Sequence, residues 1–174
     1  MAKTTIDTWN PEFPELSPIY APLQSTARCY SQFSNWPELG QLAQQFKACN
    51  HQLTPVAQDG KPEKFEDHYE PRIYLKHELQ TRTQNWHDFF NAMVWLNFNK
   101  TKSILNELHY FSALERQPGS NRSTLENAIT LFDECGIIII SNDEDLLSMI
   151  RHHQWKKLFY HHRQDFGKNI FCFV

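Results

Sequence analysis

The chain has 174 residues, which is enough for one domain with a hydrophobic core of its own. Its 17 Lys and Arg residues nearly balance 20 Asp and Glu residues, for a net charge of −3, so we expect no nucleic-acid partner, although this balance leaves room for a local basic pocket. The sequence shows no secretory signal and no apolar run of the roughly 20 residues that a membrane span needs, which predicts a cytoplasmic protein without a membrane partner.

Glycine and cysteine usage limits the cofactors. The chain has 5 Gly residues, and it contains neither a P-loop nor a Gly-x-Gly-x-x-Gly fingerprint. We therefore expect no nucleotide-binding motif. The 4 Cys residues are far apart and form no Cys-x-x-Cys pair, so we expect reduced, mostly structural thiols.

Prolines dominate the N-terminal segment. Four of them within residues 1–25 predict an extended arm, because proline lacks the amide that a helix interior uses. The aromatic residues among them, including Trp9 and Phe13, indicate that this arm packs on the domain. After the arm, apolar residues at helical spacing predict a helix over residues 37–48.

The next stretch is predicted to contain a loop and a strand. Pro55, Gly60 and Pro62 are typical of turns and predict a loop over residues 54–64. A short alternating pattern around residues 72–75 predicts a strand within residues 69–79. Because Pro71 lies beside it, we expect this strand at the edge of a sheet.

Two helices are predicted in the middle of the chain, over residues 85–98 and 101–114. The first begins with Asn85 as its N-cap and is apolar almost all the way round, which predicts a central position. The second has an apolar stripe that should face the core, formed by Ile104, Leu108 and Phe111. Because the connection between the helices is short, we expect them to lie antiparallel.

The C-terminal part contains further helices and two strands. Ser123 and Glu126 have the spacing of a capping box and predict a helix that ends at Cys135. Ile137–Ile140 predicts a buried strand, residues 143–151 a short helix, and residues 169–174 a last strand. Since no repeat and no linker is present, we expect a single α+β domain over residues 1–174, with a helical core and a small sheet.

Polar residues recur at core-like positions of the two central helices, where they are costly unless they are hydrogen-bonded. The first helix carries His87, Asp88 and Asn91, and the second carries Lys102, Asn106 and His109. If the two polar faces meet, these side chains converge on a pocket in which a histidine could act as acid or base and a lysine could hold an anion. The alternative is that the groups satisfy one another and the helix ends.

Two carboxylates, Asp133 and Glu134, lie near the end of the next predicted helix, where negative charge opposes the helix dipole. They could pair with Arg82 or Lys102, or lie in solvent. A divalent metal beside His87 and Asp88 is not favoured, because adjacent helical residues diverge by about 100°. The histidine pairs at residues 152–153 and 161–162 lie among Lys and Arg residues, which indicates a solvated or anion-contacting surface.

The central segment is similar to a known family. The string Thr81-Arg82-x-x-Asn85-Trp86-His87-Asp88-x-Phe90-Asn91-Ala92-x-x-Trp95, followed by Phe98, Lys102, Asn106 and His109, resembles the signature of a bacterial family called domain of unknown function 3025. Three further parts of the chain also fit, namely Tyr69-Glu70-x-Arg72-Ile73-Tyr74, Thr130-Leu131-Phe132-Asp133-Glu134-x-Gly136, and Trp9 with Trp36-Pro37. The resemblance implies a fold and a set of residues, and it implies no reaction.

The chain departs from the family pattern at two places. Family members usually have a glycine near position 77, where this chain has His77. They also usually continue past the last strand with a Gly-His-Ala-Leu stretch, whereas this sequence ends at Phe171-Cys172-Phe173-Val174.

Two hypotheses follow from these residues. In the first, the protein is an enzyme for a small anionic or phosphorylated substrate, with His87, Asp88, His109 and Asp133 as catalytic residues, and with substrate held by Arg82, Asn91, Lys102, Asn106 and Glu134. In the second, it is a non-catalytic module that binds a ligand or a protein. The N-terminal arm would then be a contact surface, and the polar residues would be structural.

Overall fold

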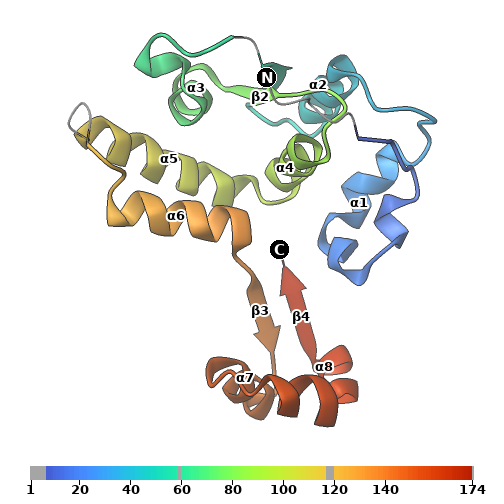
Figure 1. The fold of residues 1–174 in the computed structure, drawn as a ribbon. Helices are drawn as coiled ribbons and strands as arrows, with labels where there is room; N and C mark the ends of the chain where they lie inside the picture. The colour runs from blue at the N-terminus through green and yellow to red at the C-terminus, as the bar shows by residue number, and fades with distance from the viewer. Residues whose placement is uncertain (1–6, 59, 117–119, 174) are drawn as a thin grey trace. The chain divides into compact units, whose positions relative to one another are not determined.

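The computed structural model describes residues 7–58, 60–116 and 120–173. The chain divides into two compact units, Met1–Asp133 and Glu134–Val174, and each is described by itself. Both units combine helices with a two-stranded sheet (Figure 1). The predicted α+β class with a helical core and little sheet is therefore confirmed.

The N-terminal segment is built of short helical turns. It contains the 3₁₀ helices η1 (Phe13–Glu15), η2 (Pro18–Leu23) and η3 (Arg28–Tyr30), together with helix α1 (Gln24–Ala27). The predicted extended conformation is wrong for residues 13–25, because η1 and η2 have proline in the first turn, where the missing amide costs nothing. Within this segment Phe13 is buried, and the Trp9 indole stacks on Trp86 at 5.1 Å between ring centroids.

A parallel pair of strands flanks one helix in the first unit. Strand β1 (Thr54–Ala57) pairs with β2 (Glu78–Thr81), and helix α3 (Tyr69–Lys76) lies between them in sequence. The loop prediction is therefore wrong at residues 54–57. The strand prediction around residues 72–75 is also wrong, because Pro71 falls in the first turn of α3, where proline is compatible with a helix.

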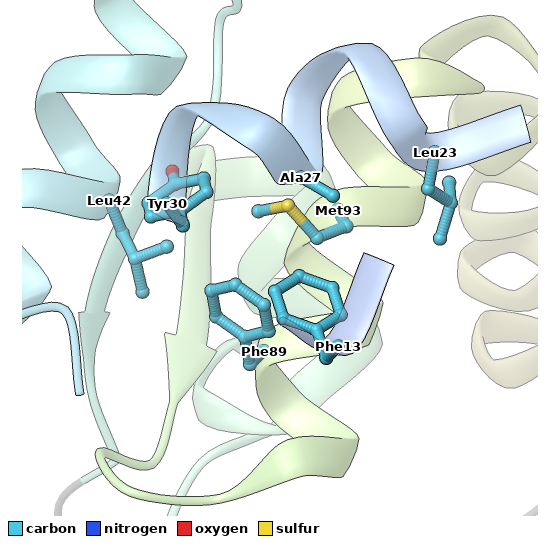
Figure 2. Close-up of a cluster of buried hydrophobic side chains, with 7 residues drawn as sticks. All are labelled: Phe13, Leu23, Ala27, Tyr30, Leu42, Phe89 and Met93. Carbon is cyan, nitrogen blue, oxygen red and sulfur yellow. The ribbon is translucent and has the colours of Figure 1, made fainter. Parts of the chain in front are cut away.

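Helix α4 (Trp86–Asn97) is the centre of the first unit, as predicted. On one side it contributes Phe89 and Met93 to a core cluster that also contains Phe13, Leu23, Ala27, Tyr30 and Leu42 (Figure 2). On the other side it contributes Ala92 and Trp95 to a second cluster, with Phe46 of helix α2 (Leu39–Ala48) and with Leu53, Ile73 and Leu79. The predicted N-cap is confirmed, because the Asn85 side chain accepts a hydrogen bond from the Asp88 amide at 3.0 Å.

Helix α5 (Asn99–Glu115) follows α4 but does not lie antiparallel to it. In Figure 1, α4 is seen nearly along its axis, whereas α5 runs across the view. The antiparallel neighbour of α5 is α6 (Thr124–Cys135): Lys102 near the start of α5 pairs with Asp133 near the end of α6, and Arg116 after α5 pairs with Glu126 near the start of α6. The predicted helix ending at Cys135 is confirmed.

The two faces of α5 are reversed relative to the prediction. Lys102 and Asn106 are buried, with 8% and 5% of their surface exposed. The predicted core stripe is exposed instead, by 57% at Ile104, 41% at Leu108 and 47% at Phe111. Helix α5 therefore buries its polar face and exposes its apolar face, opposite to an ordinary amphipathic helix.

The second unit has an antiparallel sheet and three helical segments. Strand β3 (Ile138–Ser141) pairs with β4 (Ile170–Phe173), and between them lie α7 (Glu144–Arg151), a π-helical turn (Lys157–His161) and α8 (Arg163–Asn169). Its core is formed by Leu146, Met149 and Leu158. Both predicted strands are present, but the first is not buried, since Ile138 and Ile140 are exposed by 45% and 53%.

Two features of the described residues complete the fold. All four cysteines are free, and three of them, Cys29, Cys49 and Cys135, are exposed, so the expected free thiols are not buried core residues. Within the described ranges, every helix is too short or too polar to cross a membrane.

Candidate functional site

The turn before α4 builds one polar group, which we call the carboxylate–histidine site (Arg82, His87 and Asp88). Gln84 adopts a left-handed conformation in this turn, with φ 55°, and the turn folds Arg82 back onto the start of α4. Asp88 Oδ2 accepts hydrogen bonds from the Arg82 backbone amide at 2.8 Å and from Arg82 Nε at 2.9 Å. Asp88 Oδ1 accepts a third from Arg82 Nη2 at 2.8 Å. The carboxylate is thus clamped at both oxygens.

This clamp decides the ionisation of Asp88. Burial of the carboxyl acts to raise its pKa, but hydrogen bonds from Arg82 and His87 outweigh burial and hold the pKa below its usual value. Asp88 is therefore an anion at neutral pH. Its position in the first turn of α4 adds the favourable field of the helix N-terminus.

His87 is the solvent-facing member of the carboxylate–histidine site. Its Nδ1 lies 2.9 Å from Asp88 Oδ1, and 77% of the side chain is exposed. Since an ionised carboxylate only accepts hydrogen bonds, Nδ1 must carry the proton. In the neutral ring, the lone pair is then on Nε2. This is the arrangement of a histidine base held by a carboxylate.

A second group of polar residues lies between α3, α4, α5 and α6. We call it the buried polar cluster after its two buried members, Lys102 and Asn106. Its other members are the half-buried Glu70 and Asn91 and the more exposed Tyr69 and Asp133. Lys102 Nζ donates to both Asp133 oxygens, at 2.6 and 2.8 Å. The same ammonium lies 5.5 Å from the centroid of the Trp95 ring, close enough for a cation–π interaction. Lys102 is therefore occupied on two sides.

Glu70 is held at the start of α3. Asn106 Nδ2 donates to Glu70 Oε2 at 2.6 Å and to the Glu70 backbone carbonyl at 2.9 Å. Burial raises the pKa of Glu70, although the hydrogen bond from Asn106 and the charges of His109 and Lys102 act in the opposite direction. The single amide of Asn106 thus fixes both the side chain and the backbone of Glu70.

Tyr69 joins α3 to α4 within the buried polar cluster. Asn91 Nδ2 donates to the Tyr69 hydroxyl at 2.7 Å. Burial, followed by the negative charges of Glu70, Asp133 and Asp88, raises the pKa of Tyr69, against a lowering effect of the hydrogen bond from Asn91. The hydroxyl is therefore uncharged at neutral pH.

The candidate residues from the two central helices divide between these groups. His87, Asp88 and Arg82 come together at the start of α4, while Asn91, Lys102, Asn106 and Asp133 lie in the buried polar cluster. His109 is half-buried and contributes charge near Glu70. Glu134 is exposed and belongs to the second unit.

Tyr69 and Glu70 are members of the buried polar cluster that the sequence analysis did not select as site residues. They lie in the segment predicted as an edge strand, and Glu70 is 36 positions away from Asn106 in the chain. The segment Tyr69-Glu70-x-Arg72-Ile73-Tyr74 was noted only for its family resemblance. If this segment is predicted as a helix, Tyr69 and Glu70 fall in its first turn. They are then candidates to contact the polar residues of the other helices.

Two surface hollows are present in the described part of the chain. One is narrow and lies beside Trp36, Arg82 and Phe89, and the other lies within residues 153–162. Lys102, Asn106 and Glu70 line neither of them. Among the described residues, no three His, Cys, Asp or Glu side chains are grouped so that they could hold a metal ion.

Comparison with known proteins gives one match. The model of the family described as a protein of unknown function (DUF3025) matches residues 53–174, which include both polar groups described above. The match does not include Trp9 and Trp36-Pro37. No curated protein and no solved structure matches the chain. Since the matched segment is more than half of the sequence, the chain belongs to the DUF3025 family of proteins of unknown function.

Proposed function

We propose that this protein is a non-catalytic binding module for a protein partner, and that the buried polar cluster is its internal scaffold. The observation that carries the proposal is the reversed orientation of α5. This helix buries Lys102 and Asn106 and exposes Ile104, Leu108 and Phe111.

The polar residues between the helices already have partners within the protein. A substrate that used Lys102, Asn106 or Asn91 would have to displace hydrogen bonds of 2.6 to 2.9 Å to other protein groups. Groups that are satisfied in this way favour a structural role, since removal of one partner leaves the other buried without a hydrogen bond. The buried polar cluster therefore supports the second of the two sequence-based hypotheses.

The apolar residues of α5 lie exposed on one side of the helix. Ile104, Leu108 and Phe111 are spaced i, i+4 and i+7, so they form one stripe along the helix. A contiguous row of exposed apolar side chains is typical of a surface that binds a protein. Stripes with this spacing dock into apolar grooves of partner proteins.

The N-terminal arm supports a contact surface less well than α5 does, because two of its aromatic residues are held within the fold. Phe13 is 3% exposed and lies in the core with Phe89. The Trp9 indole donates to the Phe33 carbonyl at 2.8 Å, so its polar group is also occupied within the fold. The binding surface is proposed on α5 instead.

The test replaces the stripe without touching the scaffold. The double variant Ile104→Lys/Leu108→Lys is compared with Glu107→Lys, a control on the exposed side of the same helix. Each tagged protein is purified from the same cells, and its self-association and bound proteins are compared by sedimentation and mass spectrometry. We expect wild type and Glu107→Lys to share a partner, or a dimer, that the stripe variant lacks, while all three melt within about 2 °C of one another.

Two results would contradict the proposal. If the stripe variant melts much lower than the control, the stripe is packed inside the protein and is no binding surface. If all three proteins are monomers with the same bound proteins, the stripe has no partner.

One observation favours a second candidate function, an enzyme acting by His/Asp acid–base chemistry on a small anionic substrate. His87 is exposed while its Nδ1 is held by a clamped carboxylate. The test is a screen of phosphorylated metabolites for turnover with wild type, His87→Ala and Glu107→Lys. An enzyme would lose turnover in His87→Ala at an unchanged melting temperature. Equal rates in all three proteins would rule out His87 as the base.

A further inference from the structure

The second unit has a basic surface that the net charge of the whole chain conceals. Residues 151–168 contain five Lys or Arg residues and one Asp, a net charge of +4 with neutral histidines, while the whole chain is −3. Arg151 at the edge of this segment is paired with Glu144 at 3.4 Å, so among the described residues the lysines and Arg163 carry the unpaired positive charge near the hollow. The segment also contains four histidines. Local positive charge of this kind attracts anions.

The same segment forms an open hollow of about 710 Å³. Its lining includes Lys156 and Lys157 together with His153, Trp155, His161 and His162. The lysines are exposed. The described lining contains no acidic residue, and Asp165 lies outside it, 3.2 Å from His162 Nδ1. The hollow is therefore lined by cations and rings, with one carboxylate bound to a histidine at its side.

Flat rings are exposed along this surface. The His153 and Trp155 rings stack at 5.4 Å with an interplanar angle of 30°, and Trp155 and Phe159 stack at 6.0 Å and 17°. Trp155 is 47% exposed and Phe159 is 50% exposed. Positively charged side chains alone are enough to bind a phosphate or a carboxylate. The exposed rings therefore indicate a ligand that also has a flat face, which can stack on them.

The backbone under the hollow is irregular but anchored. His153 adopts a left-handed conformation with φ 53°, and residues Lys157–His161 form a π-helical turn, a feature that is frequent at functional sites. Leu158 lies within this turn and is 1% exposed, packed with Leu146 and Met149. The buried leucine fixes the turn while its neighbours Lys157 and Phe159 point outward.

We propose that this hollow binds nucleotide units, with bases stacked on Trp155 and phosphates held by Lys156 and Lys157, as presented by single-stranded nucleic acid. Proteins that bind single strands without sequence preference combine a positive groove with exposed aromatic rings. The open form of the hollow suits a passing strand. The proposal is independent of the proposed function, because it concerns a different unit of the chain and a different ligand.

The test uses the full-length protein and a fluorescent 12-nucleotide oligo(dT). Anisotropy is measured with wild type, Trp155→Ala, Lys156→Gln/Lys157→Gln and the control Lys47→Gln/Lys100→Gln, which removes the same charge from exposed positions of the first unit. We expect affinity to fall about tenfold in Trp155→Ala. In the lysine variant, the slope of log K against log salt should become shallower by about 1.4. The control should bind like wild type.

Competitors separate the sources of the ligand. If unlabelled oligo(dT) displaces the probe and thymidine monophosphate does not, the site binds a strand. If both displace the probe at equal nucleotide concentration, the site binds single nucleotides. Equal binding of a duplex, equal competition by polyglutamate, or an unchanged affinity in both site variants would overturn the proposal. If Trp155→Ala has a lowered melting temperature, the lysine variant decides, since both lysines are exposed.

Discussion

The carboxylate–histidine site and the buried polar cluster use the same kinds of residue in opposite ways. In the first, Arg82 clamps Asp88, and the clamped carboxylate holds an imidazole that is 77% exposed. In the second, Lys102 and Asn106 are themselves buried and bind carboxylates of other helices. The first group presents a side chain to solvent, and the second ties helices together.

This difference separates groups that can act from groups that hold the fold. An exposed imidazole can gain or lose a proton without a large cost to stability. A buried ammonium that loses its carboxylate is left uncompensated in a medium of low polarity, which is strongly destabilising. Loss of the carboxylate that pairs with the buried Lys102 should therefore cost more free energy of unfolding than substitutions at His87 or on the α5 stripe.

The largest expected effect is that of Asp133→Asn, which keeps the shape of the side chain and removes its charge. The buried Lys102 ammonium then loses its carboxylate, and we expect the free energy of unfolding to fall by about 3 kcal/mol. The measurement is urea denaturation at pH 7. The control is Glu134→Gln, an exposed acid on the same helix, which should change stability by less than about 0.5 kcal/mol. Equal losses in the two variants would break the comparison.

The next effect is that of Asp88→Asn, which removes the charge from the clamp. We expect a loss of about 2 kcal/mol at pH 7, since three hydrogen bonds from Arg82 to a charged acceptor are weakened. The pKa of Asp88 lies below its usual 3.8, so its contribution is full above pH 3.8 and is lost as pH falls through the folded-state value. The gap between variant and wild type should therefore narrow as the pH falls below 3.8. A gap that widens there would contradict this account.

A smaller effect, in the stabilising direction, is expected at the end of α3, the helix that brings Tyr69 and Glu70 to the buried polar cluster. His77 is exposed and has φ 55°, a left-handed conformation that costs a non-glycine residue about 1 kcal/mol. His77→Gly should raise the free energy of unfolding by about that amount. His77→Ala keeps the Cβ and should not, so equal effects of the two changes would argue against backbone strain.

Glu70→Gln should change how the free energy of unfolding depends on pH more than it changes the free energy of unfolding itself. The direction of this pH effect should be opposite to that of Asp88→Asn. The pKa of Glu70 is raised above 4.5, so the stability it contributes is present below pH 4.5 and is lost as pH rises through the folded-state value. Glutamine keeps an acceptor for Asn106 and cannot ionise. The variant should therefore gain on wild type between pH 4.5 and neutrality. A gain that shrinks over this range would be inconsistent with a raised pKa.

Local signals explain what could be predicted from the sequence. The start of α4 was predicted from Asn85, and its central position from an apolar pattern on nearly every side. The capping box that begins α6 is present, with Ser123 and Glu126 exchanging hydrogen bonds. Each of these features depends on residues within one helix. The start of α3 was not predicted, because the alternating pattern of residues 72–75 is typical of a strand. Pro71 is also compatible with the first turn of a helix, and this is where it lies.

The orientation of α5 could not be predicted in this way. Its periodicity identifies two faces, and which face is buried depends on the helices around it. Here Glu70 of α3 and Asp133 of α6 supply partners for Asn106 and Lys102, so burial of the polar face is satisfied. Because α3 was predicted as a strand, Glu70 could not be identified from the sequence as the partner of Asn106. The division of the candidate residues into two groups follows from the same contacts.

The orientation of α5 is the central claim, and one pair of urea denaturation curves tests it most directly. Leu108→Lys places a charge on the exposed stripe, and Asp133→Asn removes the partner of Lys102 on the buried face. We predict that Leu108→Lys stays within about 0.5 kcal/mol of wild type, while Asp133→Asn loses about 3 kcal/mol. The reverse order, a large loss for Leu108→Lys and none for Asp133→Asn, would mean that α5 packs through its apolar stripe and would contradict the account.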